Sequence, residues 1–121
     1  MPKRVMTVDD SRTMREMVSL TLRKAGFEVT EAEDGRQALS MLKAAPVDVV
    51  ITDLNMPNMD GVALISALRQ DPKWRAVPIL MLTTESDSAK KAAGKNAGAT
   101  GWLVKPFDPV KLIDVVKRVA G

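Results

Sequence analysis

Five short apolar runs lie along the chain, and apolar residues recur at intervals of three and four in most of the longer segments between them. The runs occupy residues 5–8, 27–30, 49–52, 79–82 and 102–104. The first, third and fourth are almost continuously apolar, which is typical of parallel strands covered on both faces. The run at 27–30 alternates between apolar and polar residues, which favours an edge strand.

Helical periodicity indicates an amphipathic helix after each of the first three runs and after the last. The first ends near Gly26, which suits the left-handed position beyond a helix end. The second spans about 34–44, the third ends at the Asp-Pro pair 71–72, and the last begins at the Asp-Pro pair 108–109. The residues expected on the buried faces are Met14, Met17, Val18, Thr21, Leu22, Ala25, Ala38, Leu39, Leu42, Val62, Leu64, Ile65, Leu68, Val110, Leu112 or Ile113, Val116 and Val119.

The segment at 86–98 differs from these helices because its apolar face consists only of alanines. It also contains Gly94, and an interior glycine costs a helix about 1 kcal/mol relative to alanine. Two interpretations are open. The segment is either a weakly packed surface helix, or a helix whose weak packing allows it to shift, as a conformational switch requires.

Five strands, each followed by a helical segment, predict parallel pairing through right-handed crossovers. We therefore expect an α/β fold in which a five-stranded parallel sheet lies between two layers of helices, a three-layer sandwich. A length of 121 residues fits one domain of ordinary size, which we expect to span 1–121.

The composition restricts the chemistry open to this chain. Cysteine and histidine are absent, which excludes disulfides, thiolate nucleophiles, cysteine-ligated metals and the commonest zinc ligand. The net charge is only +3 and no run of five like charges occurs, so we do not expect nucleic-acid binding. The apolar runs are too short for a membrane span or a signal peptide, and we expect a cytoplasmic monomer.

Polar side chains follow four of the five predicted strands. Asp9 and Asp10 come after the first strand, Asp53 after the third, Thr83 after the fourth and Lys105 after the fifth. Parallel strands have their carboxyl ends at one edge of a sheet, and ligands of open α/β sheets bind outside that edge. We therefore expect these side chains to form one pocket.

Each of these residues also has a purely structural interpretation. One of the adjacent aspartates is expected to cap the next helix, Asp53 would suit a turn, Thr83 would end a strand, and Lys105 would belong to a solvated loop. A helix cap needs one carboxylate, however, and it explains neither the third acid nor the lysine.

Three neighbouring carboxylates require a cation, because two carboxylates about 4 Å apart repel by roughly 4 kcal/mol at an effective dielectric constant near 20. An oxygen-only ligand set suits Mg²⁺, and the backbone carbonyl of Asn55 could add a ligand. A carboxylate beside Mg²⁺ and a lysine can attack phosphorus, and Asp53, alone on the middle strand, is the best nucleophile. Lys105 would neutralise the phosphoryl oxygens, and Thr83 would donate a hydrogen bond to one of them.

These motifs resemble the bacterial response-regulator receiver domain along essentially the whole chain. The matching features are Asp9-Asp10 after the first strand, Asp53 within Thr-Asp-Leu-Asn-Met-Pro-Asn-Met-Asp-Gly, Thr83 after Ile-Leu-Met-Leu, and Lys105 within Gly-Trp-Leu-Val-Lys-Pro-Phe. Asn55 follows Asp53 by two residues and Glu85 follows Thr83 by two, so the chain looks most like the single-domain chemotaxis receivers of the CheY type.

The resemblance implies a flavodoxin-like fold with strand order 2-1-3-4-5. It implies a signalling switch rather than an enzyme in the ordinary sense, although such a domain catalyses its own phosphorylation and slow dephosphorylation. Asp53 would accept a phosphoryl group from a chemotaxis histidine kinase. Asp10, Asp53 and the Asn55 carbonyl would bind Mg²⁺, with Asp9 assisting.

The resemblance also implies which parts move. Lys105 and Thr83 would contact the phosphoryl group, and the peptide bond between Lys105 and Pro106 would be cis. Trp102 takes the place of an aromatic residue, usually tyrosine, that rotates inward when Thr83 moves. Leu54 replaces a tryptophan that some members carry beside the nucleophile, which removes a fluorescence probe of metal binding.

The surface expected to move comprises the weak helix, Trp102 and the last helix. It carries Lys90, Lys91, Lys95, Lys111, Lys117 and Arg118. We expect an acidic partner such as the flagellar motor switch protein, and a phosphatase as a further partner, unless these side chains serve solubility alone. The alternatives are a phosphate sink or relay intermediate in another two-component pathway, a flavodoxin-like electron carrier, and a phosphatase with an aspartyl nucleophile.

Overall fold

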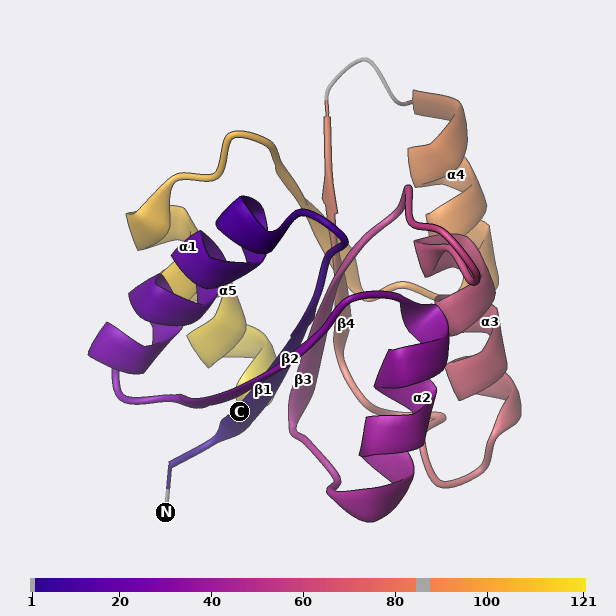
Figure 1. Ribbon diagram of the computed structural model, residues 1–121, viewed down its shortest axis with the longest axis horizontal. Helices are drawn as coiled ribbons and strands as arrows, with labels where there is room; N and C mark the ends of the chain where they lie inside the picture. Colours follow the sequence, from indigo (N-terminus) through magenta and orange to yellow (C-terminus); the bar gives the residue numbers. More distant parts are fainter. Residues whose placement is uncertain (1, 85–87) are drawn as a thin grey trace.

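Strands and helices alternate along the chain in the computed structural model, which describes residues 2–84 and 88–121 (Figure 1). The elements are β1 (Arg4–Val8), α1 (Arg12–Lys24), β2 (Glu28–Ala32), α2 (Gly35–Ala44), β3 (Val49–Asp53), α3 (Gly61–Gln70), β4 (Ile79–Thr83), α4 (Ser88–Ala97), β5 (Gly101–Val104) and α5 (Pro109–Ala120). The strands pair in parallel in the order β2-β1-β3-β4-β5. The predicted three-layer α/β sandwich and its strand order are thus confirmed.

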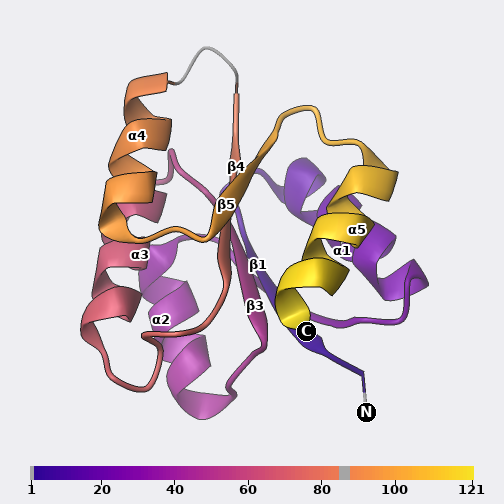
Figure 2. The same cartoon turned by 180° about the vertical axis from the view of Figure 1, so that it is seen from behind.

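The sheet separates two apolar clusters that hold the helices in place. Helices α2, α3 and α4 cover one face of the sheet, and α1 and α5 cover the other (Figure 2). Successive residues of β4 enter the two clusters in turn: Ile79 and Met81 pack on the α2–α3 side, and Leu80 and Leu82 on the α1–α5 side. Burial on both faces explains why the central strands read as continuous apolar runs.

The edge strand β2 departs most from its predicted bounds of 27–30. The strand begins at Glu28 and ends at Ala32. Phe27 precedes it, donates its N–H to the carbonyl of Leu22 at the end of α1, and packs on the α1–α5 side of the sheet. The large apolar residue therefore closes a helix end rather than starting a strand. The other four strands match their predicted bounds to within one residue at each end.

Two residues predicted on buried helix faces are exposed, namely Met17 on α1 and Val110 on α5. The buried row of α5 contains Leu112 and Val116, four residues apart. Successive helix residues are rotated by about 100°, so Val110 lies on the far side of the helix from Leu112. Met17 is likewise rotated away from Val18, which is buried.

Helix α4 is held to the sheet by little apolar packing, as predicted. Gly94 is its one buried residue among those described. A Cβ atom at Gly94 would overlap the side-chain sulfur of Met81 on β4, so glycine is what lets the helix approach the strand. Residues 86 and 87 of the predicted helix, and Glu85, lie outside the described residues.

The direction of the strands sorts the loops between the two edges of the sheet. The carboxyl ends of all five strands point to one edge, whereas β1 begins and α5 ends at the opposite edge (Figure 1). The loops that follow β1, β3, β4 and β5 therefore meet at one end of the molecule. In the part of the chain that the structure describes, no helix has the length and apolar character needed to cross a bilayer.

Candidate phosphoacceptor and metal site

Lys105 bridges two aspartates at the carboxyl edge of the sheet. Its Nζ lies 3.0 Å from Oδ1 of Asp53 and 3.6 Å from Oδ2 of Asp9. Only 19% of the Lys105 side chain and 3% of the Asp9 side chain are exposed. Shielding from water and salt makes such a pair stronger than a surface ion pair, so Lys105 does not belong to a solvated loop.

Asp53 is fixed from both sides by its own chain. It ends β3, in the middle of the sheet, and its Oδ1 accepts a hydrogen bond of 2.8 Å from the N–H of Leu54. The hydroxyl of Thr52 donates to the Asp53 carbonyl at 2.8 Å. The loop that follows closes when the N–H of Gly61 donates to the Leu54 carbonyl, and a Cβ at Gly61 would overlap the Asp53 carbonyl oxygen. Only glycine allows α3 to start so close to Asp53.

The cap of α1 is Ser11, and the prediction that an aspartate would provide it is wrong. The Ser11 hydroxyl accepts from the N–H of Met14 at 3.3 Å, while the Ser11 N–H donates to Oδ1 of Asp9 at 2.9 Å. Asp9 directly follows β1, which ends at Val8. Its carboxylate therefore reaches only the N–H of Ser11, the residue before the first turn of the helix. Neither aspartate is used as the cap.

Three carboxylates gather beside Lys105. Asp9, Asp10 and Asp53 each offer a ligand oxygen, and these oxygens lie within 4.8 Å of one another. Burial raises the pKa of Asp9, and the charges of Asp53 and Asp10 add to this, against the Ser11 N–H and Lys105. Crowded, partly desolvated carboxylates with oxygen as the only donor atom suit a hard divalent cation such as Mg²⁺. Asn55, whose backbone carbonyl was predicted to add a ligand, lies two residues beyond Asp53 and is exposed.

Thr83 ends β4 and is buried, next to the central strand that carries Asp53. Its hydroxyl donates to the carbonyl of Thr84 at 3.4 Å, which is long for an O–H···O hydrogen bond. The N–H of Lys105 donates to the Thr83 carbonyl at 2.7 Å, which ties the two predicted residues together through the backbone. The Thr83 hydroxyl thus has a weak partner that it can exchange for a stronger acceptor.

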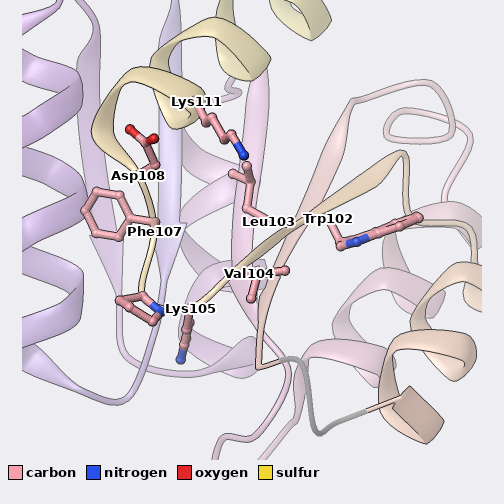
Figure 3. Close-up of a pocket in the computed structure, with 8 residues that line it drawn as sticks. Trp102, Leu103, Val104, Lys105, Phe107, Asp108 and Lys111 are labelled. Carbon is pink, nitrogen blue, oxygen red and sulfur yellow. The ribbon is translucent and has the colours of Figure 1, made fainter.

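Trp102 lies on β5 and leans toward α4, with 40% of the residue exposed. The ammonium groups of Lys91 and Lys95 lie 4.6 and 4.7 Å from the centre of its ring, within range of cation–π attraction. Figure 3 shows Trp102 and Phe107 on opposite sides of β5, where a groove of about 720 Å³ follows the strand.

The peptide bond between Lys105 and Pro106 is cis, as the resemblance implied.

Sequence reasoning missed Arg15, which contacts the backbone of this site. Its Nη1 donates to the carbonyl oxygen of Asp9 at 2.7 Å. The available signal was an arginine between Met14 and Val18, on the half of α1 that faces the sheet. Lys91 and Lys95 were identified as surface charges, but their contact with Trp102 depends on the placement of α4 against β5, which the sequence does not reveal.

Comparison with known proteins gives consistent matches. The family described as response regulator receiver domain matches residues 5–117. The chain is 41% identical over 120 residues to the chemotaxis protein CheY1 of Helicobacter pylori, covering 98% of this chain and 97% of that protein. It is 39% identical over 117 residues to CheY-3 of Vibrio cholerae, covering 96% and 90% of the two chains.

The solved structures agree with the sequence relatives. The structure of the chemotaxis response regulator CheY4 of Vibrio cholerae superposes with a TM-score of 0.91 at 50% sequence identity, and the match covers 98% of this chain and 99% of that one. Fold and sequence similarity therefore extend over almost the same residues.

Proposed function

The chain belongs to the response regulator receiver domain family, and from that premise we propose that Asp53 accepts a phosphoryl group from a chemotaxis-type histidine kinase. Phosphorylation-dependent signalling is the function of this family, and CheY-type receivers interact with histidine kinases and downstream targets. The observation that carries the proposal is the pairing of Lys105 with Asp53 at 3.0 Å, beside two further aspartates.

The acidic cluster is proposed to hold Mg²⁺. Asp9, Asp10 and Asp53 would provide carboxylate oxygens and Asn55 its backbone carbonyl. When bound, Mg²⁺ supplies positive charge that offsets the charge of the phosphoryl oxygens.

The chain's own residues carry out the rest of the transfer. A carboxylate oxygen of Asp53 forms a bond to phosphorus, and the bond from phosphorus to the imidazole nitrogen of the donor breaks, so that the donor leaves with the electron pair. The ammonium of Lys105 already lies against Asp53 and stays to balance the charge of the phosphoryl oxygens. The product is an aspartyl phosphate. The domain would thus catalyse its own phosphorylation, and slow hydrolysis of the aspartyl phosphate would reset it.

The switching step is proposed to start at Thr83, whose hydroxyl would leave the Thr84 carbonyl for a phosphoryl oxygen. Lys105 is paired with Asp53 beforehand, so Thr83 makes the one new charge-assisted hydrogen bond. Such a bond contributes about 1.5–3 kcal/mol, which corresponds to a factor of roughly 10 to 150 in a two-state equilibrium. Trp102 would follow Thr83 inward once its contacts with α4 are released.

The output surface is proposed to be the face formed by α4, β5 and α5. Its basic side chains outnumber its acidic ones, since Asp114 is the one carboxylate within the bounds of these elements. An acidic target such as the flagellar motor switch protein fits this charge. A pull-down with that protein, with and without a phosphoryl analogue, distinguishes motor binding from a phosphate-sink role.

Chemical labelling tests the phosphoacceptor. Acetyl phosphate with Mg²⁺ should add one phosphoryl group to the protein, read by intact mass, and Asp53→Asn should abolish the addition. Asp60→Asn is the matched control: Asp60 caps α3 in the same loop, accepts from the N–H of Ala63, and asparagine caps equally well. Labelling of the Asp53 variant at the wild-type level would exclude Asp53 as the acceptor.

A further inference from the structure

Arg15 of α1 contacts the acidic cluster through the backbone, not through a carboxylate. Its Nη1 donates to the carbonyl oxygen of Asp9 at 2.7 Å, a short charge-assisted hydrogen bond. The Arg15 side chain is 11% exposed. A buried guanidinium that donates a hydrogen bond to a carbonyl oxygen fixes the position of that carbonyl.

The Asp9 carbonyl lies outside both the sheet and the helix. The N–H of Asp9 donates to the carbonyl of Ala32 on β2. The first carbonyl that accepts a hydrogen bond from α1 is that of Ser11, which accepts from the N–H of Arg15. The peptide between Asp9 and Asp10 is therefore oriented by Arg15. Because this peptide precedes Asp10, its plane sets the direction in which the Asp10 side chain leaves the backbone.

Arg15 is itself anchored by the edge strand. Its Nε lies 3.2 Å from Oε1 of Glu31 on β2, and the other oxygen of Glu31 lies 3.5 Å from the guanidinium of Arg23. In the sheet, Glu31 pairs with Thr7, two residues before Asp9. The guanidinium is thus held between β2 and the turn that carries the two aspartates.

We propose that Arg15 is a positioning residue for the divalent-cation site, acting on Asp10 through the Asp9 carbonyl. This inference rests on the proposed function, because it presumes that the acidic cluster binds Mg²⁺. Partners that orient metal ligands commonly change metal affinity by 10- to 100-fold when they are removed. We expect the lower end of that range, about tenfold, because Arg15 acts through one peptide group.

The charge of Arg15 has the opposite effect on a cation. A guanidinium near the site repels Mg²⁺, so loss of its charge alone would strengthen Mg²⁺ binding. A positioning role predicts weaker binding in spite of that loss. The sign of the change in affinity therefore separates the two roles. If Arg15 merely stabilised the fold, a variant that keeps its charge would leave the affinity unchanged.

The test is the dissociation constant for Mg²⁺, measured by calorimetric titration of the full chain. Arg15→Gln removes the charge and the fork, whereas Arg15→Lys keeps the charge and loses the fork. Arg15→Lys should bind Mg²⁺ about tenfold more weakly than wild type, and Arg15→Gln should also bind more weakly but by a smaller factor, because loss of the charge partly offsets the loss of positioning. Arg12→Gln is the matched control, since Arg12 lies three residues earlier on α1, has 82% of its side chain exposed, and pairs with Glu16 at 2.9 Å. Its affinity should stay within twofold of wild type.

Urea unfolding in EDTA accompanies the titration and checks that each variant is folded. If Arg15→Gln does not fold, Arg15→Lys decides the matter. An Mg²⁺ affinity in the Arg15 variants that equals or exceeds that of wild type overturns the inference and leaves the proposed function intact. A wild-type protein that binds no Mg²⁺ overturns both.

Discussion

Asp9 is a carboxylate that the fold buries at the end of β1. Burial raises its pKa above the ordinary value of 3.8, and the neighbouring charges of Asp53 and Asp10 act in the same direction. A carboxyl group whose pKa is higher in the folded chain than in the unfolded chain favours folding when it is protonated. The contribution of Asp9 to stability is therefore lost as the pH rises from about 4 through its pKa in the folded protein.

Asp9→Asn should remove this loss. In EDTA at pH 7 we expect the variant to have a higher free energy of unfolding than wild type, because the amide keeps an acceptor for the Ser11 N–H and carries no charge. The two proteins should converge as the pH falls toward 4. Urea unfolding at a series of pH values measures the difference.

Asp10→Asn is the companion variant. Asp10→Asn should also raise the free energy of unfolding without Mg²⁺. The rise should be smaller than for Asp9→Asn, because Asp10 is exposed. A decrease in stability at pH 7 for the Asp9 variant would mean that its pairing with Lys105 outweighs the cost of burial.

Most of the candidate site could be predicted from the order of residues. Asp53 and Thr83 end their strands, and Asp9 and Lys105 directly follow theirs. The rule for parallel sheets brings these carboxyl ends to one edge. What the sequence did not reveal was how the residues divide their hydrogen bonds. Whether Ser11 or an aspartate caps α1 depends on where the chain leaves β1, which is a matter of a single residue.

At the scale of elements, α4 and β5 meet through Trp102 and two lysines. The Lys91 and Lys95 ammonium groups lie within 5 Å of the ring centre. Exposed cation–π contacts contribute about 0.5–1 kcal/mol each. Together they favour the outward position of the ring by about 1–2 kcal/mol, which the proposed inward turn of Trp102 would have to overcome.

Replacing both lysines by methionine should release the ring. Methionine keeps most of the apolar stem and removes the charge, so the ratio of inward to outward ring should rise by a factor of roughly 5 to 30. A blue shift of tryptophan emission in the activated protein reports the change. Lys90→Met on the same helix is the control. Emission spectra of the double variant that match wild type in both states would contradict the stabilising role of the two lysines.

The prediction of elements was most reliable where burial was symmetrical. β3 and β4 are covered on both faces, so their apolar runs have nearly the bounds of the strands. β2 lies at an edge, and its end depends on pairing with β1 as far as Ala32, opposite Val8. The buried faces of the helices were predicted less accurately, since Val110 is apolar yet lies opposite the buried row of α5.

At the scale of the whole molecule, a cation at the acidic cluster would join the loops after β1 and β3. A ligand that binds the folded chain but not the unfolded chain stabilises the fold by mass action, by about 2.7 kcal/mol when the ligand is at 100 times its dissociation constant. We expect Mg²⁺ at that concentration to raise the free energy of unfolding by this amount, and EDTA to reverse the effect. Asp53→Asn should show a smaller gain, measured by urea unfolding. An equal gain in that variant would place the stabilising ion elsewhere.

The position of the chain ends has a practical consequence. The chain enters the sheet at the start of β1 and leaves through α5 at the edge away from Asp53 (Figure 1). A fluorescent label, a surface tether or a second protein module fused at either end would leave the approach of a phosphodonor open. Immobilised on beads by either end, the protein should therefore take up label from acetyl phosphate at the rate of the untethered chain.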